Sequence, residues 1–336
     1  MADFIEMLSP KQLVDISDNF DYLKATEKFI GEKLFPLKKS NNIKLDLMRL
    51  EESSKIPVMA QVHGLDTEAR IGDRPNPVRT NAEMFYVKEK LDQGERLTKY
   101  LRETGMDRTK DAFNKIIFDD AKNLIHRVLT RAEVAICELL STGKLTINEN
   151  NVSLEFDYVT DEKQYLEVSS WGTSTTKILA KLNEIQKLTG YKIKRMLTSG
   201  KVLGYLLTND EIIALAKQTG DYPNKVWLEN YFATKVGIEI YTYDEVYKKS
   251  ALENTKYRFY PENKITFLTT TGALGNTFTT TSPLEDFNTA KTVFKGHVGL
   301  KQWKSEDPET IWTLAGGIFL PAPQTPEELW ICTVKS

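Results

Sequence analysis

The feature that most constrains this chain is a continuous helical pattern over residues 107–141. Apolar side chains recur there at steps of three and four residues, which gathers them into one stripe along a helix of about 3.6 residues per turn. This stripe consists of Phe113, Ile116, Ile117, Ala121, Leu124, Ile125, Val128, Ala132, Ala135, Ile136 and Leu139. At about 1.5 Å per residue the helix would be roughly 50 Å long, far above the average for folded proteins.

The two ends and the second side of this helix can also be read from the sequence. Asp107 is a suitable N-cap, and Gly143 follows the last helical residues as a stop signal. The side opposite the apolar stripe carries Lys110, Asp111, Lys115, Asp119, Lys122, Arg127 and Glu133. We therefore expect that side to face water or another polar surface. A long core helix of an unrelated fold would show the same pattern.

The composition is that of an ordinary folded chain. With 336 residues, 40% hydrophobic and 27% charged, the chain can bury one large core or two smaller ones. The 45 basic residues nearly balance the 47 acidic ones, so no overall positive field marks a nucleic-acid binder. The two cysteines, Cys137 and Cys332, are too few for a disulfide framework. The sequence shows no secretion signal and no stretch that could span a membrane. We therefore expect the protein to work in a cytoplasm, with reduced cysteines and without contact to a membrane.

The segments before the helix have too few apolar residues for a core of their own. Residues 1–50 show short helical and strand patterns that are broken at Gly31 and Pro36. This predicts an arm that leans on another part of the protein. Residues 55–80 are polar and contain several arginines and prolines. This second segment is typical of a long hairpin that projects from the body, and an unstructured surface loop would have the same composition.

After the helix, an α/β region is followed by a β-rich region. A hairpin is predicted at 145–158, and helices alternate with strands between 173 and 243 in a separately folded lobe. Asn209 and Asn224 are expected to cap two of these helices. Later strands are predicted at 265–268, 293–303, 310–319 and 329–334, with an irregular stretch at 269–281 and an interruption at 320–323. Because these late strands need an apolar surface to cover, we expect them to pack beneath the long helix.

The sequence contains no recognisable catalytic or metal-binding motif. The histidines, His63, His126 and His297, have no spacing that would place them together on one metal ion. Residues 199–201 resemble part of a phosphate-binding loop but lack the upstream glycine and the hydroxyl residue after the lysine. We therefore expect no catalytic residue, no cofactor and no metal. The alternative is a cytoplasmic α/β enzyme with its active site in the lobe at 165–247.

Several short motifs follow one another along most of the chain. They are Ile56-Pro57-Val58, Tyr260-Pro261-Glu262-Asn263-Lys264, Leu274-Gly275-Asn276-Thr277, Asp307-Pro308, Leu320-Pro321 and Glu328-Leu329-Trp330. In this order, and together with the long helix, they resemble the lambda-type major capsid protein family of tailed bacteriophages. Each motif is short, so the resemblance depends on their order and on the helix.

The resemblance implies an α+β protein with the Hong Kong 97 capsid fold. Such a fold has an N-terminal arm, an extended E-loop, a P-domain with a long spine helix and an antiparallel sheet, and an α/β A-domain. In this chain the arm would be residues 1–50, the E-loop 51–100, the P-domain 101–159 with 271–336, and the A-domain 160–270. The spine helix would be the predicted helix at 107–141.

The resemblance also implies a function. The protein would be a major capsid protein that self-assembles into pentamers and hexamers of an icosahedral phage head. The head would enclose double-stranded DNA, contacted without sequence specificity. A scaffolding protein and a portal protein would take part in assembly, and a decoration protein is left open. The protein would assemble in the bacterial host cytoplasm and reside in the virion. An encapsulin-like compartment on the same fold is the main alternative.

Five charged residues in the extended segment are predicted to make contacts between subunits. They are Lys55, Arg70, Asp73, Arg74 and Arg79. In the implied fold this segment lies over a neighbouring subunit, and guanidinium groups can bind carboxylates through two hydrogen bonds. A solvated loop surface would carry the same charges, so both interpretations stay open at this stage.

Overall fold

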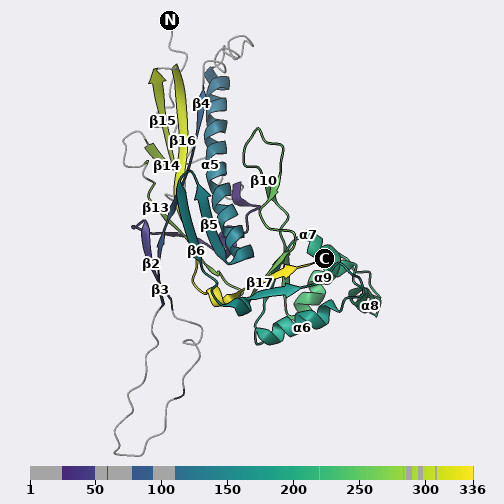
Figure 1. The fold of residues 1–336 in the computed structure, drawn as a ribbon. Coiled ribbons are helices and arrows are strands. Elements are labelled where there is room, and N and C mark those ends of the chain that lie inside the picture. Colours follow the sequence, from purple (N-terminus) through teal and green to yellow (C-terminus); the bar gives the residue numbers. More distant parts are fainter. Residues whose placement is uncertain are drawn as a thin grey trace, which may run out of the picture.

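The computed structural model describes most of the chain. The described residues are 25–49, 59, 78–93, 110–218, 220–282, 284, 290–293, 298–306 and 309–335. Asp107, the predicted N-cap of the long helix, lies outside them, as does most of the segment predicted as a hairpin or surface loop. In Figure 1 a long helix runs beside one sheet, and a second sheet with shorter helices around it lies near the end of this helix.

The long predicted helix is confirmed as α5 (Lys110–Thr142), a single helix of 33 residues. It ends where the sequence predicts, because Gly143 adopts a φ of +74°. The N–H of this glycine donates to the carbonyl oxygen of Leu139 at 2.8 Å. Within the described side chains the apolar stripe is buried from Ala121 onward, so α5 acts as one wall of the core.

A six-stranded sheet lies under α5 (Figure 1). Its strands are β1 (Leu37–Lys39), β4 (Phe85–Gln93), β13 (Gly275–Thr280), β14 (Ala290–Val293), β15 (Val298–Glu306) and β16 (Glu309–Pro323). The long strand β16 pairs with β4 along one edge and with β15 and then β13 along the other. The pairs are antiparallel except that of β1 with β13. The late strands therefore pack beneath the long helix, as predicted.

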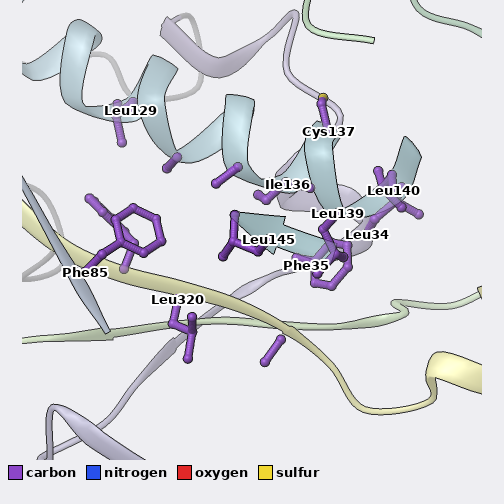
Figure 2. Packing of buried hydrophobic residues seen from close by; sticks show 14 of the residues in the cluster. Leu34, Phe35, Phe85, Leu129, Ile136, Cys137, Leu139, Leu140, Leu145 and Leu320 are labelled. Carbon is purple, nitrogen blue, oxygen red and sulfur yellow. The ribbon is translucent and has the colours of Figure 1, made fainter. Parts of the chain in front are cut away.

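The core between α5 and this sheet includes the arm (Figure 2). Leu34, the last residue of the short helix α3 (Gly31–Leu34), and Phe35 lie beside Leu139 of α5. Leu320 and Phe85 enter the same cluster from β16 and β4. Phe35 is 1% exposed, and complete burial of such a side chain stabilises a fold by about 1.5–3 kcal/mol. This part of the arm therefore belongs to the core.

The prediction of an irregular stretch at 269–281 is wrong in its second half. Residues 275–280 form β13, which pairs with β16 on one side and with β1 on the other. Threonine favours strands when neighbouring strands are available for pairing. Because both partners are distant in the sequence, local composition does not reveal this strand.

The predicted interruption at the prolines is also wrong, because β16 continues through Pro321 and Pro323. Proline lacks an N–H, so it fits a strand only where its nitrogen does not face a partner. The N–H of Gln324 donates to the carbonyl oxygen of Leu274 next to β13. Since successive nitrogens point to alternate sides, both proline nitrogens point away from β13. On that other side, the pairing with β4 ends at Phe319, so the prolines interrupt no ladder.

The lobe near the end of α5 contains a five-stranded sheet in the order β7-β17-β12-β8-β9. Its strands are β7 (Tyr165–Val168), β8 (Arg195–Thr198), β9 (Glu239–Thr242), β12 (Lys264–Leu268) and β17 (Leu329–Val334). The helices around it are α6 (Ile178–Leu188), α7 (Gly200–Leu207), α8 (Asp210–Gln218) and α9 (Lys225–Tyr231), which continues as a π-helical segment over Phe232–Val236. The predicted alternation of helices and strands is confirmed, and the last strand of the chain joins this sheet.

The described residues also form three two-stranded sheets. They pair β2 (Lys44–Arg49) with β3 (Val78–Glu83), β5 (Lys144–Glu149) with β6 (Val152–Asp157), and β10 (Val246–Tyr247) with β11 (Tyr257–Arg258). The second pair is the predicted hairpin, and Asn150 and Asn151 form its turn with positive φ angles. In the first pair Arg49 lies opposite Val78, so the two ends of the intervening segment are side by side.

Candidate assembly surfaces

The five residues predicted to contact other subunits lie in or next to the segment between β2 and β3. Lys55, Arg70, Asp73 and Arg74 lie outside the described residues. The backbone of Arg79 lies in β3, opposite Met48 of β2. The structure therefore brings none of the five together, and their role stays a prediction.

The arm is attached to α5 through the carboxylate of Glu133. Its Oε1 accepts a hydrogen bond from the N–H of Ile30 at 2.9 Å, and its Oε2 accepts one from the N–H of Gly31 at 3.0 Å. The hydroxyl of Tyr243 donates to Oε1 at 3.1 Å. The first two of these hydrogen bonds satisfy backbone amides at the start of α3 that would otherwise lack an acceptor. One side chain thus joins the arm, α5 and the segment after β9.

Of the two surroundings expected for Glu133, water or another polar surface, the first is wrong, because the residue is only 3% exposed. The sheet covers one side of α5 here, and the arm together with Tyr243 and Phe259 covers the other. Burial raises the pKa of the Glu133 carboxyl, and the hydrogen bonds from Ile30, Tyr243 and Gly31 partly oppose that rise. The available sequence signal is an acidic residue with apolar neighbours on both sides, which does not by itself reveal a second covering layer.

The more exposed side of α5 forms the floor of a groove of about 1120 Å³. Its walls are residues 25–29 of the arm, β4, the β5-β6 hairpin and residues 245–251. The ion pairs along it are Lys28 with Glu245 (3.6 Å), Arg127 with Glu89 (2.5 Å) and Arg131 with Glu149 (3.1 Å). These three pairs match opposite charges within the chain, and Lys88, Lys248 and Lys249 add further basic groups to the lining of the groove.

The segment at 199–201 is not a phosphate-binding loop. The hydroxyl oxygen of Ser199 accepts a hydrogen bond from the N–H of Val202 and so caps α7. The N–H of Gly200 donates to the two carboxylate oxygens of Asp244, at 2.9 and 3.0 Å. Asp244 also pairs with Arg258. A carboxylate of the chain itself therefore occupies the position that a phosphate group would need.

The remaining reactive side chains form no site in the part of the chain that the structure describes. No group of three or more His, Cys, Asp or Glu residues there could hold a metal ion. His126 packs against an aromatic ring of the arm, while His63 and His297 lie outside the described residues. Cys137 and Cys332 are buried thiols, and burial raises the pKa of Cys332 to about 12. Among the described helices, none combines the length and the apolar character needed to span a bilayer.

Comparison with known families gives one match along almost the whole sequence. The family described as phage major capsid protein E matches residues 12–334. The chain belongs to this family. The resemblance seen in the sequence motifs is therefore confirmed. Among curated proteins, none matches the chain.

Solved structures of phage proteins have the same fold. A protein assigned as a prophage capsid protein of E. coli CFT073 has a TM-score of 0.63 and 15% identity, covering 98% of this chain and 100% of that chain. A phage-related protein from Bordetella bronchiseptica RB50 has a TM-score of 0.53 and 10% identity, with 98% of each chain covered. The mature capsid of bacteriophage PhiM1 has a TM-score of 0.51 and 8% identity, covering 98% and 91%. At these identities the similarity shows the fold, which is the predicted α+β capsid fold.

The family gives the general function of this chain. It is a phage major capsid protein, a structural protein that self-assembles into the shell of the virion. Because the family and its fold are those of structural capsid proteins, the enzyme alternative is not supported.

Proposed function

We propose that copies of this chain form pentamers and hexamers of an icosahedral phage head that encloses double-stranded DNA. The observation that most supports this proposal is the family match over residues 12–334, which includes both α5 and the lobe. The subunit is elongated, with a lobe at one end (Figure 1), and so has a large surface for its mass. Contacts repeated between identical copies use such a surface, and each contact can then be individually weak.

The proposed division of the chain has an arm at 1–50, an E-loop at 51–100, a P-domain at 101–159 with 271–336, and an A-domain at 160–270. The course of α5 and most of the six-stranded sheet supports the P-domain, and helices α6 to α9 support the A-domain. Several strand pairs cross these boundaries. β1 pairs with β13, β2 with β3 and β4 with β16, and β17 joins the sheet of the lobe. These pairings connect the proposed domains into one body.

In the assembled shell, the segment between β2 and β3 would lie over a neighbouring subunit. Lys55, Arg70, Asp73, Arg74 and Arg79 are the proposed contact residues. The register of β2 with β3 supports this role, because it brings both ends of the segment to one place on the body. Arginine suits such contacts, since its guanidinium group can bind a carboxylate of the neighbour through two hydrogen bonds.

Other partners follow from the proposed role. A scaffolding protein and a portal protein would act during assembly in the bacterial cytoplasm, a decoration protein is left open, and the packaged DNA would be contacted without sequence specificity. The chain has a formal net charge of −2, so any attraction to DNA must come from local basic patches.

Sedimentation velocity of the purified chain, produced alone and together with a scaffolding protein, tests this proposal. We expect capsomers or complete shells, which sediment far faster than a 38.4 kDa subunit. A single monomeric species under both conditions would contradict the proposal.

A further inference from the structure

Glu133 is a buried carboxyl group whose hydrogen bonds, within the part of the chain that the structure describes, come from uncharged groups. Besides the amides of Ile30 and Gly31 and the hydroxyl of Tyr243, the thiol of Cys137 lies 3.8 Å from Oε1. No lysine, arginine or histidine of the described chain is paired with it. Burial disfavours an ion that lacks an opposite charge, because the lost hydration is only partly replaced by neutral donors.

The ionisable groups that the structure places beside this carboxylate are acids. They are Cys137 on α5, Tyr243 after β9, and Glu32 on α3, which lines the same small cavity. Next to Tyr243, Glu245 is paired with Lys28 at 3.6 Å. The parts of β13 and β16 that line the small cavity beside Glu133 contribute no titratable group. Tyr243 and Cys137 lower the pKa of Glu133 only as neutral hydrogen-bond donors, so among the described residues none of these groups supplies a compensating positive charge.

The position of the arm depends on this contact. α3 begins at Gly31, and Ile30 before it has no side-chain cap of its own, so Glu133 supplies the acceptor for both amides. A Cβ on Gly31 would lie 2.3 Å from Oε2 of Glu133 and 2.5 Å from Cδ1 of Ile136. Glycine at this position is what allows the backbone to approach the carboxylate so closely.

We propose that Glu133 is a proton-dependent clasp for the arm. In its protonated form the carboxyl group accepts hydrogen bonds from the amides of Ile30 and Gly31 and donates its own proton to the hydroxyl oxygen of Tyr243, which holds residues 25–34 against α5. Loss of the proton loosens this segment. β1 follows directly and is held separately by its pairing with β13. Opening would therefore affect the arm before residue 35 and leave β1 in place.

The direction of the pH dependence follows from linkage. Because burial raises the pKa of Glu133 above its ordinary value of 4.5, the docked arm binds a proton more tightly than the released arm. The arm is held most strongly at pH values below the ordinary pKa, and less strongly as the pH rises towards the raised pKa. Between these two pKa values, the equilibrium constant for release of the arm can increase by at most about tenfold per pH unit, because one proton is lost. Above the raised pKa this constant no longer changes with pH.

Hydrogen exchange of the full-length, unassembled subunit tests this inference. Protection factors, corrected for the intrinsic exchange rate, are measured from about pH 4.5 to about pH 8 for peptides within residues 25–34 and 36–40. We expect protection of the first peptide to fall by up to about tenfold per pH unit before it levels off, with little change in the second. A first peptide whose protection stays constant or rises with pH would overturn the proposal.

Two variants identify the responsible group. In Glu133→Gln the protection of residues 25–34 should no longer depend on pH, whereas Asp119→Asn, which removes an exposed carboxylate from the same helix, should retain the wild-type profile. Persistence of the wild-type profile in Glu133→Gln would assign the effect to another group and overturn the proposal. If Glu133→Gln does not fold, the wild-type profile is compared with that of Gly31→Ala. The added methyl group keeps the backbone of residue 31 away from the carboxyl group of Glu133, so residues 25–34 of this variant should lose protection at every pH.

Discussion

Replacement of Gly275 by alanine tests the pairing of β13 with β16. A Cβ on this residue would lie 2.2 Å from the carbonyl oxygen of Ala322 and 2.6 Å from Cα of Pro323. Both are backbone atoms of β16, so no side-chain rotation can relieve the contact and the two strands must separate. Such overpacking costs about 1–3 kcal/mol, of which the lower entropy of the unfolded alanine chain offsets about 0.4–1 kcal/mol.

Thermal unfolding of the unassembled subunit, followed by tryptophan fluorescence, measures this effect. An unfolding entropy of about 2.1 cal/mol/K per residue gives about 0.7 kcal/mol/K for a chain of 336 residues. A net loss of about 1–2 kcal/mol then lowers Tm by about 1.5–3 °C.

Gly272→Ala is the matched control for this prediction. Its Cβ would meet only Oγ1 of Thr270, at 3.8 Å, which is an ordinary contact. We expect its unfolding free energy to stay within about 0.5 kcal/mol of the wild type. An unchanged Tm in Gly275→Ala, or an equal decrease in Gly272→Ala, would refute the predicted closeness of β13 and β16.

Three further substitutions test other parts of the structure. Phe35→Ala leaves a cavity between the arm, α5 and the sheet. It should lower the free energy of unfolding, measured by urea denaturation, by about 3–5 kcal/mol. A loss below about 1 kcal/mol would place the arm outside the core. Tyr243→Phe removes the hydroxyl that forms a hydrogen bond with the buried carboxyl group of Glu133 and should cost about 1–3 kcal/mol in the same assay. An unchanged midpoint would argue against that hydrogen bond. Arg74→Glu should reduce the yield of shells while leaving the Tm of the subunit unchanged; a normal yield would remove this residue from the proposed contacts.

Much of the fold can be predicted because it is encoded locally. The apolar period of α5 spans several turns, and Gly143 marks its end, so helix and terminus are both readable. The turn of the β5-β6 hairpin contains two asparagines, which tolerate positive φ. Asn224 caps α9 as predicted, accepting a hydrogen bond from the N–H of Trp227 at 2.9 Å. In each case neighbours in the sequence decide the structure.

The wrong predictions concern features that depend on distant partners. β13 exists because β1 and β16 flank it, and the prolines of β16 are tolerated because the pairing with β4 ends before them. Glu133 is buried because the arm, about 100 residues earlier in the chain, crosses the polar side of α5. A helical pattern shows which residues share a side, but it does not show how many other segments cover that side.

The candidate contact residues illustrate the same limit for function. Their charges and their place between two paired strands indicate a surface for other subunits, but the sequence of one copy does not contain the geometry of its neighbours. The family resemblance supplied that expectation, and the match over residues 12–334 confirmed the family.

Electron cryo-microscopy of particles assembled from the full-length chain tests the central claim most directly. We predict closed icosahedral shells whose subunits, arranged as pentamers and hexamers, contain α5 beside the six-stranded sheet with the lobe at its end. Each segment between β2 and β3 should lie against a neighbouring subunit. Isolated monomers with that segment folded onto their own body would contradict the account.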